Sequence, residues 1–290
     1  MADGIVIDGR ALAANVKAGL VKRVNSLKAA GKSVRLDAIL VGGNQGAALY
    51  AKNQAKACDE IGIDYALHEL QDGACEVTLI QLIDDLNSDK SVTGIMAHMP
   101  LPPEVDASVI QSRISSSKDV EGVNPANIGN VVFGRRSLVP CTALAVIELI
   151  ESTGAKLQGA NVVCVGASRI VGKPVAVLLM QAEATVISTN IHTKDRSSLT
   201  RNADIVVTAA GVPNLIGPDD IAQGAIVIDV GINRIENGDG KKKTVGDVNF
   251  EAVKEKASYI SPVPGGVGPM TVAMLLRNTV QAGERQAADS

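Results

Sequence analysis

Apolar residues near the start of the chain recur at the spacing of an α-helix. They are separated by four, four, four and three positions, so that all of them share one helical face. Gly31 follows them as a stop, because glycine readily adopts the left-handed backbone conformation that ends many helices. The pattern therefore predicts a first amphipathic helix, and its apolar positions are Leu12, Val16, Leu20, Val24 and Leu27.

The rest of the first half alternates between strand-like and helix-like segments. A strand is expected over 36–41, a helix over about 47–61 that Gly62 stops, and a strand over 93–97 that a proline-rich segment closes. A further helix begins after Pro140, where we place the domain boundary.

Short apolar runs separated by glycines and helical segments dominate the second half. Near-continuous apolar runs are typical of parallel strands that helices cover on both faces. Together with the length of 290 residues, they predict an α/β fold of two domains. The runs are 161–165, 184–188, 204–208 and 225–230, and a last helix is expected over about 270–286.

The composition indicates a globular protein with an aliphatic core, since 46% of the residues are hydrophobic and only 2% are aromatic. A formal net charge of −3 argues against nucleic acid or a membrane surface as partner, and the basic run at 241–243 is expected to belong to a solvated turn with 237–240. The start lacks a basic region followed by an apolar one, and no stretch approaches ~20 apolar residues. We therefore expect a cytoplasmic protein.

Cysteines and histidines do not form a metal-binding pattern. The four cysteines include no Cys-x-x-Cys pair, and the three histidines are scattered. We expect reduced thiols and no metal site.

A glycine-rich turn in the second half is a candidate phosphate cradle. The strand 161–165 runs into Gly166-Ala167-Ser168, and a helix follows from Pro174. Glycine lets the backbone approach a pyrophosphate, and the helix N-terminus presents free N–H groups. The spacing is Gly-x-Ser-x-x-x-Gly rather than Gly-x-Gly-x-x-Gly, so by itself it equally fits a plain turn in a cofactor-free domain. Small residues after the next strands, at 209–211 and 231–233, favour a dinucleotide site.

Seven segments resemble, in the same order, the signatures of the methylenetetrahydrofolate dehydrogenase/cyclohydrolase (FolD) family. The resemblance covers essentially the whole chain, and Pro-Val-Pro-Gly-Gly-Val-Gly-Pro is its most specific part. The segments are 6–9, 94–102, 118–122, 140–142, 170–174, 246–248 and 262–271.

The resemblance implies an enzyme of folate one-carbon metabolism that uses NAD or NADP. It implies a folate-binding catalytic domain over 1–140, completed by 270–290, and a Rossmann-type domain over 141–269. A tetrahydrofolate derivative is expected in a cleft between the domains, and the protein is expected to be a homodimer. The substrate contacts that the family implies in the last loop are Pro264, Gly265 and Gly266.

Departures from the family pattern gather at the expected folate site. Tyr50, which stacks on the pterin in the family, is retained, but the catalytic lysine is Gln54. A serine of the same motif is Ala47, the glutamine that supports the lysine is His98, and the aspartate that holds the pterin is Glu121. Without the resemblance, Tyr50 would be read as a packing residue, His98 as a solvated histidine and Glu121 as a surface charge.

The cofactor turn also departs from the pattern. The arginine usual after Gly166 is Ala167, and the usual Cys-His-Ser is Thr189-Asn190-Ile191. Both changes remove groups that would hold a 2′-phosphate, so we expect NAD to be accepted at least as well as NADP. Arg169, Lys173 or Arg196 are candidates to compensate. The expected cofactor contacts are Gly166, Ala167, Ser168, Ile191 and Ile232.

These departures separate the two reactions of the family. Hydride transfer from 5,10-methylenetetrahydrofolate requires orientation and a dry site, because a folate nitrogen stabilises the cation. Hydrolysis of the methenyl cation requires a group with a tunable pKa, which Gln54 is not, whereas His98 is a candidate base. We expect a dehydrogenase with weak or lost cyclohydrolase activity. A fully bifunctional enzyme, a catalytically silent folate- or nucleotide-binding paralogue, and a modified pterin as substrate remain alternatives.

Overall fold

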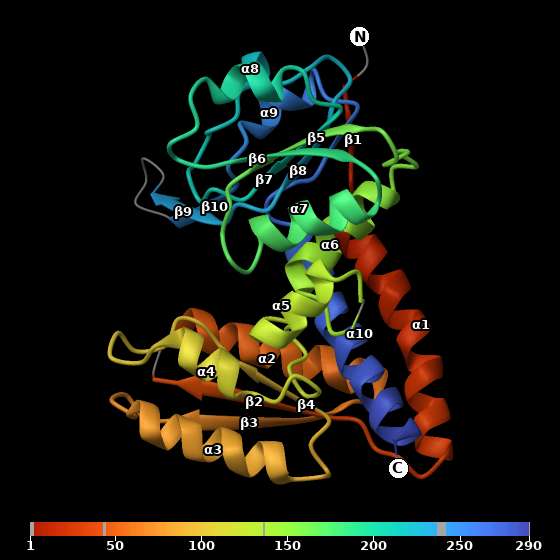
Figure 1. Cartoon of the computed structure of the whole chain (residues 1–290), viewed down its shortest axis with the longest axis vertical. Helices are drawn as coiled ribbons and strands as arrows, with labels where there is room; N and C mark the ends of the chain where they lie inside the picture. Colours follow the sequence, from red (N-terminus) through yellow and green to blue (C-terminus); the bar gives the residue numbers. More distant parts are fainter. Residues whose placement is uncertain (1–2, 43–44, 136, 237–241, 290) are drawn as a thin grey trace. The chain divides into compact units, whose positions relative to one another are not determined.

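The chain forms two α/β units in the computed structural model, which describes residues 3–42, 45–135, 137–236 and 242–289 (Figure 1). One unit takes in the N-terminal segment through Ala13 together with Thr142–Thr271, and the other takes in Ala14–Cys141 with Val272–Ser290. The expected two-domain α/β architecture is confirmed, and the C-terminal helix returns to the unit built from the first half.

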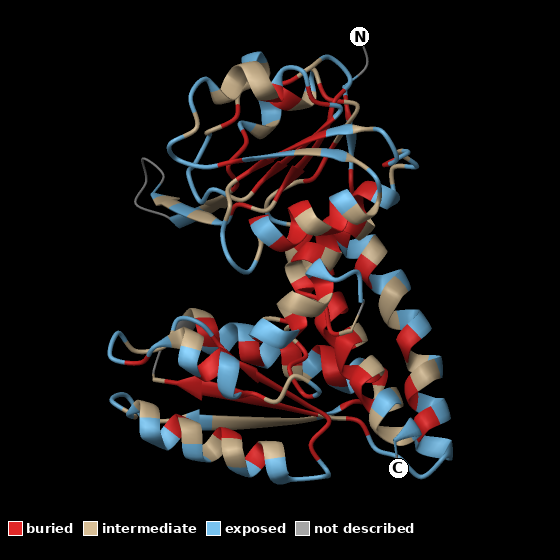
Figure 2. Ribbon diagram, in the orientation of Figure 1, coloured by how far each residue is buried: buried red, intermediate tan, exposed pale blue. Residues whose placement is uncertain are grey.

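A parallel three-stranded sheet is the centre of the unit Ala14–Cys141 with Val272–Ser290. Its order is β3-β2-β4, so β2 lies in the middle and is buried over almost its whole length, whereas β3 is more exposed (Figure 2). On one face, Ile39 and Ile95 pack into a core with residues of α3 and α4. The elements are β2 (Arg35–Val41), α2 (Gln45–Ile61), β3 (Asp64–Leu70), α3 (Glu76–Ser88), β4 (Gly94–Ala97), α4 (Ala107–Arg113) and α5 (Pro125–Val132).

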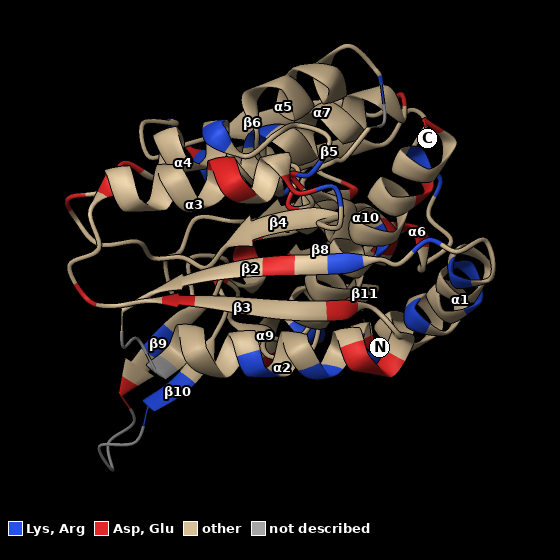
Figure 3. Ribbon diagram, turned by 90° about the horizontal axis from the view of Figure 1, so that it is seen from below, with Lys and Arg blue, Asp and Glu red and all other residues tan. Residues whose placement is uncertain are grey.

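The middle strand carries charged residues in its first half, as Figure 3 shows for β2. Asp37 is buried, and its Oδ1 accepts a hydrogen bond of 2.7 Å from the Arg35 guanidinium. His68 Nε2 lies 2.7 Å from the same oxygen. The cluster therefore joins β2 to β3 away from the carboxyl end of the sheet.

The two long helices confirm the pattern at both ends of the sequence. Helix α1 (Gly9–Ala29) buries Leu20, Val24 and Leu27, and Gly31 has the left-handed φ of +74° expected of a helix stop. Helix α10 (Val267–Ala288) contacts α1 through an exposed ion pair in which Arg23 and Glu284 are 2.7 Å apart.

The second unit contains a six-stranded sheet whose paired strands are all parallel, with the order β1-β11-β8-β7-β5-β6. Four of its strands are the predicted apolar runs, shifted by no more than about one residue. The chain leaves β5 to form β6 on one side and returns to form β7 on the other, so the order reverses at β5. The strands are β1 (Ile5–Val6), β5 (Asn161–Val165), β6 (Thr185–Thr189), β7 (Ile205–Thr208), β8 (Ile226–Asp229) and β11 (Tyr259–Ile260).

Shorter elements complete this unit. They are α6 (Cys141–Glu151), α7 (Gly172–Gln181), α8 (Arg196–Thr200), α9 (Phe250–Lys254), a 3₁₀ turn (Pro218–Asp220) and the antiparallel pair β9 (Asn233–Glu236) and β10 (Lys242–Val245). Of the expected solvated turn, 237–241 lies outside the described residues, and Lys242 and Lys243 are exposed. Within the described ranges, no helix combines the length and apolar character needed to span a bilayer.

The N-terminal strand β1 belongs to the unit of the six-stranded sheet, which the sequence did not indicate. We expected residues 1–140 to form one domain, whereas β1 pairs in parallel with β11 of the second sheet. Ile5 N–H donates to the Ser258 carbonyl and Ile7 N–H to the Ile260 carbonyl, at 2.8 and 2.9 Å. A two-residue strand has no periodicity, so only its distant partner identifies it.

One buried amide ties α10 to the unit that it completes. Asn278 Nδ2 donates to the Val120 and Val139 carbonyls, both at 2.9 Å.

We expect Asn278→Ala to lower the free energy of unfolding by about 2 kcal/mol, because two buried carbonyls lose their donor. Glu284→Ala on the same helix is the matched control, with an expected loss of less than about 1 kcal/mol, since its ion pair is exposed. Urea unfolding measures both, and equal losses would contradict this account.

Candidate active site

Four candidate residues lie around the carboxyl end of the three-stranded sheet. Gln54 of α2 contacts Met96 of β4, and His98 follows β4 directly. Because side chains alternate along a strand, Met96 and His98 point to the same face of the sheet. The backbone N–H of Ala97 donates to the Glu121 carboxyl, and Glu121 in turn affects the pKa of Tyr50. The structure thus places Gln54, His98 and Glu121 around the end of β4, with Tyr50 within electrostatic range of Glu121.

Gln54 is held firmly in a buried position. Its side chain is 1% exposed, and its Nε2 donates to the Met96 sulfur at 2.9 Å. Its Oε1 accepts a 3.3 Å hydrogen bond from the Tyr65 hydroxyl of β3. Both ends of the Gln54 amide therefore have hydrogen-bond partners. The amide itself neither takes up nor releases a proton near neutral pH.

His98 is buried with an unused ring nitrogen. Its backbone N–H donates to the Ile39 carbonyl at 2.8 Å, which extends the pairing of β4 with β2. Nε2 of the ring is buried and lacks a protein partner. Burial lowers the pKa of His98, so the neutral imidazole is favoured. A neutral ring with a free nitrogen can accept or donate one hydrogen bond to a bound molecule.

Glu121 lies in a loop that a buried carboxylate holds in place. Asp119 accepts hydrogen bonds from the N–H groups of Gly122 and Asn124 and from Nδ2 of Asn127, at 2.7–3.1 Å. Burial is the main cause that raises the pKa of Glu121 to about 8, and the nearby charge of Asp119 adds to it. A hydrogen bond from the backbone of Ala97 lowers the pKa and offsets part of this rise. The carboxyl is therefore protonated over much of the neutral range, and it both donates and accepts.

Tyr50 is half-exposed and lies within electrostatic range of this carboxyl. The residue is 47% exposed. Burial of the hydroxyl raises the pKa of Tyr50, and electrostatic interactions with Cys141 and Glu121 raise it further. The exposed ring is available for stacking, whereas the hydroxyl stays protonated. This placement fits the predicted role of Tyr50 as a platform for a planar group.

Asn278 of α10 and Cys141 at the start of α6 support the loop of Glu121, and sequence reasoning missed both. Asn278 holds the carbonyl of Val120, the residue before Glu121, and Cys141 N–H donates to the Glu121 carbonyl at 3.1 Å. Asn278 is one polar position within an amphipathic helix, so the sequence carries no sign of its role. Cys141 belongs to a family segment, but its function as a backbone support appears only in the fold.

The glycine-rich turn forms the cradle that its sequence predicts. Gly166 follows β5 with φ of +112°, and a Cβ there would overlap the Ala209 carbonyl. A Cβ on Gly172 would overlap the Gly166 carbonyl in the same way. Ser168 Oγ accepts from Gly172 N–H at 3.2 Å at the start of α7. Strand, tight turn and helix N-terminus are arranged as in a pyrophosphate site, so these residues fit a dinucleotide.

The predicted cofactor contacts surround the carboxyl edge of the six-stranded sheet. Ile191 follows β6 and is 93% exposed, and Ile232 follows β8 and is 69% exposed. Ser168 is exposed as well. Both isoleucines lie on turns beyond the carboxyl ends of parallel strands, and their exposed side chains can pack against a flat ligand. Arg196, a candidate to compensate for Ala167, instead binds the Leu215 carbonyl at 3.0 Å.

The remaining substrate candidates lie in the unit of the six-stranded sheet. Pro264, Gly265 and Gly266 follow β11, and Gly266 N–H donates to the Pro262 carbonyl at 2.8 Å. Gly265 has φ of +120°. A Cβ on Gly9 would overlap the Gly266 carbonyl, so the loop packs closely on the start of α1.

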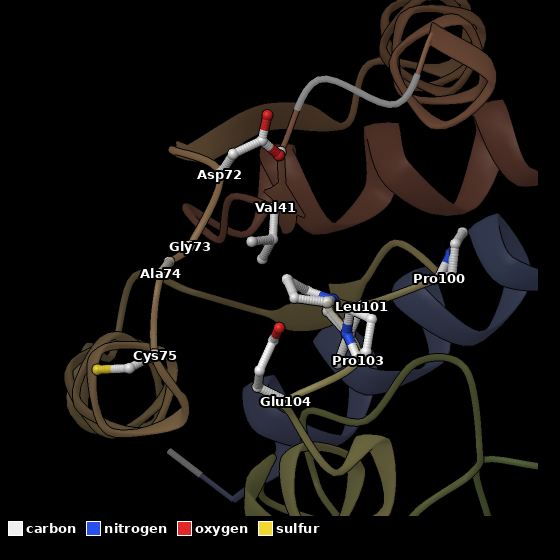
Figure 4. A pocket seen from close by; sticks show the side chains of 11 residues that line it. Val41, Asp72, Gly73, Ala74, Cys75, Pro100, Leu101, Pro103 and Glu104 are labelled. Atoms are coloured by element: carbon white, nitrogen blue, oxygen red, sulfur yellow. The ribbon is translucent and has the colours of Figure 1, made fainter.

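A cavity of about 620 Å³ lies at the carboxyl edge of the three-stranded sheet (Figure 4). Its walls come from the end of β2, from residues 72–75 between β3 and α3, and from residues 100–104 after His98. Pro100 and Leu101 provide apolar surface, and Asp72 and Glu104 provide carboxylates. The described residues contain no group of three or more His, Cys, Asp or Glu that could bind a metal ion.

Comparison with known proteins identifies the family. Residues 7–121 match the model of the tetrahydrofolate dehydrogenase/cyclohydrolase catalytic domain, and residues 140–287 match its NAD(P)-binding domain. The chain belongs to this family. The six-stranded sheet and its glycine cradle therefore form the NAD(P)-binding domain of the chain.

Individual relatives agree over nearly the full length. The bifunctional protein FolD of Moorella thermoacetica is 45% identical over 97% of this chain and 99% of its own. The crystal structure of the bifunctional FolD of Campylobacter jejuni is 46% identical, covers 97% of this chain and 98% of its own, and has a TM-score of 0.93. The Trypanosoma brucei FolD, solved with NADP and an inhibitor, is 36% identical over 99% of both chains, also with a TM-score of 0.93.

The raised pKa of Glu121 predicts a pH-dependent stability. Because its folded pKa of about 8 exceeds the ordinary value of 4.5, the native state holds a proton that the unfolded state releases between these limits. Glu121 should therefore lower the stability by about 1 kcal/mol per pH unit as the pH rises through this window. Glu121→Gln should remove that slope.

The measurement is urea unfolding of the parent and the variant from pH 5 to 9. Glu251→Gln, which changes an exposed carboxylate of α9, is the control. A parent and a Glu121→Gln variant with parallel pH profiles would show that the Glu121 pKa is not raised.

Proposed function

We propose that the chain oxidises 5,10-methylenetetrahydrofolate with a nicotinamide cofactor. The observation that carries the proposal is the dinucleotide cradle of one unit, in a chain whose other unit places Tyr50 within electrostatic range of the Glu121 carboxyl. An open aromatic ring beside a carboxyl fits a planar pterin with polar edges. The match of both halves to the family models supports this assignment.

The residues of the site bind and orient the folate. Tyr50 stacks on the pterin, and Glu121 hydrogen-bonds its polar edge, as a carboxyl that both donates and accepts. The cradle at Gly166 and the helix α7 hold the dinucleotide, whose nicotinamide accepts the hydride when it is bound. A folate nitrogen stabilises the cation that forms, so the step requires no protein base.

We propose further that hydrolysis of the methenyl product is slow. This rests on Gln54, which stands where the family pattern has its catalytic lysine and which has partners at both ends. An amide cannot take a proton from water at neutral pH. The reduced hydrolysis stays a prediction from this residue.

The fully bifunctional enzyme is the second candidate, and the comparisons favour it. The relatives described above are named as bifunctional or as dehydrogenase-cyclohydrolases. Within the site, the neutral ring of His98 supports it, because Nε2 is free to take a proton from water. The catalytically silent paralogue finds no support in these relatives.

The homodimer and the cytoplasmic location also stay predictions. Strand β6 is an edge of the six-stranded sheet and leaves Ile187 partly exposed. An exposed edge strand can pair with a second copy, which supports the dimer.

Turnover of 5,10-methylenetetrahydrofolate with each cofactor tests the first proposal. Production of NADH or NADPH should be observed, and kcat/KM for NAD should equal or exceed that for NADP, because Ala167 offers no charge to a 2′-phosphate. Ala167→Arg is the matched variant and should shift the ratio toward NADP by about tenfold. A strong preference of the parent for NADP would contradict the cofactor prediction, and no turnover with either cofactor would favour the silent paralogue.

Restoring the lysine tests the second proposal. Gln54→Lys alone should add little methenyl hydrolysis, because a lysine needs orientation by neighbours and both Ala47 and His98 depart from the pattern. The triple variant Ala47→Ser, Gln54→Lys, His98→Gln should gain more than tenfold, since residues of one catalytic unit are strongly non-additive. Loss of the methenyl absorbance, corrected for uncatalysed hydrolysis, measures the rates.

The parent and His98→Gln decide between the two candidates. If the parent hydrolyses the methenyl cation well above background and His98→Gln abolishes this, the enzyme is bifunctional with His98 as base. If the parent is at background, the prediction from Gln54 holds.

A further inference from the structure

Three consecutive backbone N–H groups after β7 converge on one buried carboxylate. Asp247 is completely buried, and its Oδ2 accepts from Ala210 N–H at 2.7 Å and Gly211 N–H at 3.1 Å. Its Oδ1 accepts from Val212 N–H at 2.9 Å and from Asn233 Nδ2 at 3.0 Å. A single side chain from the segment after β10 therefore fixes the loops that follow β7 and β8.

A second buried carboxylate holds Asp247 itself. Asp229, the last residue of β8, accepts from the N–H groups of Asp247 and Val248 at 3.0 and 2.9 Å. It also accepts from Gly231 N–H at 2.9 Å and from the Thr208 hydroxyl at 3.0 Å. The backbone of Asp247 is thereby anchored to β7 and β8.

Close packing leaves this arrangement no room to shift. A Cβ on Gly231 would overlap the Asp247 carboxylate, and a Cβ on Gly246 would overlap that of Asp229. On the other side, the Ala209 carbonyl lies against Gly166 of the cofactor cradle. The contacts therefore run without a gap from Asp247 through the loop after β7 to the turn after β5.

These loops lie where a dinucleotide binds in such a sheet. The strand order reverses at β5, and the crevice at the carboxyl ends of β5 and β7 is the general ligand position for an open parallel sheet. Ile232, an expected cofactor contact, stands between Gly231, which Asp229 holds, and Asn233, which Asp247 holds. The N–H groups of 210–212 are occupied by Asp247, so they serve to shape the crevice rather than to bind phosphate.

We propose that Asp247 is a positioning residue for the nicotinamide cofactor: its carboxylate sets the loops after β7 and β8 in the conformation that receives the dinucleotide. The inference rests on the proposed function of the NAD(P)-binding domain and extends it to a residue that does not touch the cofactor.

The role requires a carboxylate and not merely a polar side chain of this size. A carboxylate has only acceptor oxygens, and here both receive two donors. An asparagine in its place would direct an NH₂ group at one of these pairs of donors, which costs two hydrogen bonds and sets donor against donor. The loops would then move out of their present conformation.

Titration of the full-length protein with NADH and with NADPH, followed by their fluorescence, tests the proposal. Asp247→Asn should raise the Kd of the better-bound cofactor at least tenfold and leave the KM for 5,10-methylenetetrahydrofolate within about twofold. Asp204→Asn is the matched control, because Asp204 accepts from Asn161 N–H at 2.8 Å near the start of β5 in the same sheet. Its cofactor Kd should stay within twofold of the parent.

The readouts distinguish positioning from a purely structural role. A purely structural role would lower the number of binding sites per chain, whereas positioning raises the Kd of all sites. Asn233→Ala removes one of the four donors and should weaken binding about threefold if Asp247→Asn does not fold. A Kd within twofold of the parent for both variants would overturn the proposal. If the parent itself binds neither cofactor, the proposed function of the domain fails instead.

Discussion

The loops of both units depend on one constraint: backbone N–H groups beyond the carboxyl ends of buried parallel strands must find acceptors. A strand that ends in the interior leaves donors without a partner, and an unpaired buried donor costs about as much as a lost hydrogen bond. This chain meets the need with aspartates. Asp119 does so for Gly122 and Asn124, beyond a segment that forms a parallel bridge with β4, and Asp229 and Asp247 do so after β7 and β8.

The same aspartates place the functional groups. The loop that Asp119 holds carries Glu121, and the proximity of the two carboxyls contributes to the raised pKa of Glu121. The loops that Asp229 and Asp247 hold flank the predicted contact Ile232. Hydrogen bonds that stabilise the fold are therefore the ones that set the geometry of the candidate sites, and glycines at 166, 231 and 246 are required because the carboxylates and carbonyls pass so close to them.

The candidate folate site combines groups that keep the chemical type expected for pterin binding with polar groups that do not. Tyr50 and Glu121 are suited to a flat, polar ligand, whereas Gln54 is a neutral amide and His98 favours its neutral form. Orientation and exclusion of water are sufficient for hydride transfer, but water activation depends on a titrating group. The two reactions of the family therefore depend on different parts of one site, and a change in one need not affect the other.

Local pattern was sufficient for much of the architecture. The spacing of Leu20, Val24 and Leu27 identified α1, because burial of one helical face requires apolar residues three or four positions apart. The apolar runs identified β5 to β8, because strands covered on both faces are apolar at nearly every position. Resemblance to a family named the residues of the site, including the substitution at Gln54. Such motifs are contiguous, and contiguous information can be read from the chain alone.

Contacts between distant segments were decided only by the tertiary structure. The pairing of β1 with β11, the support of Glu121 by Asn278 and the four donors of Asp247 join residues that lie between 14 and 254 positions apart in the chain. A single buried polar residue leaves no periodic pattern in the sequence. Its hydrogen-bond partner is set by how the chain folds and not by the residues next to it in the sequence. The sequence by itself determined most of the elements, the family and the candidate residues of the site. The tertiary structure decided which carboxylates hold the loops of these residues in place, because hydrogen-bond geometry exists only after the strands have assembled.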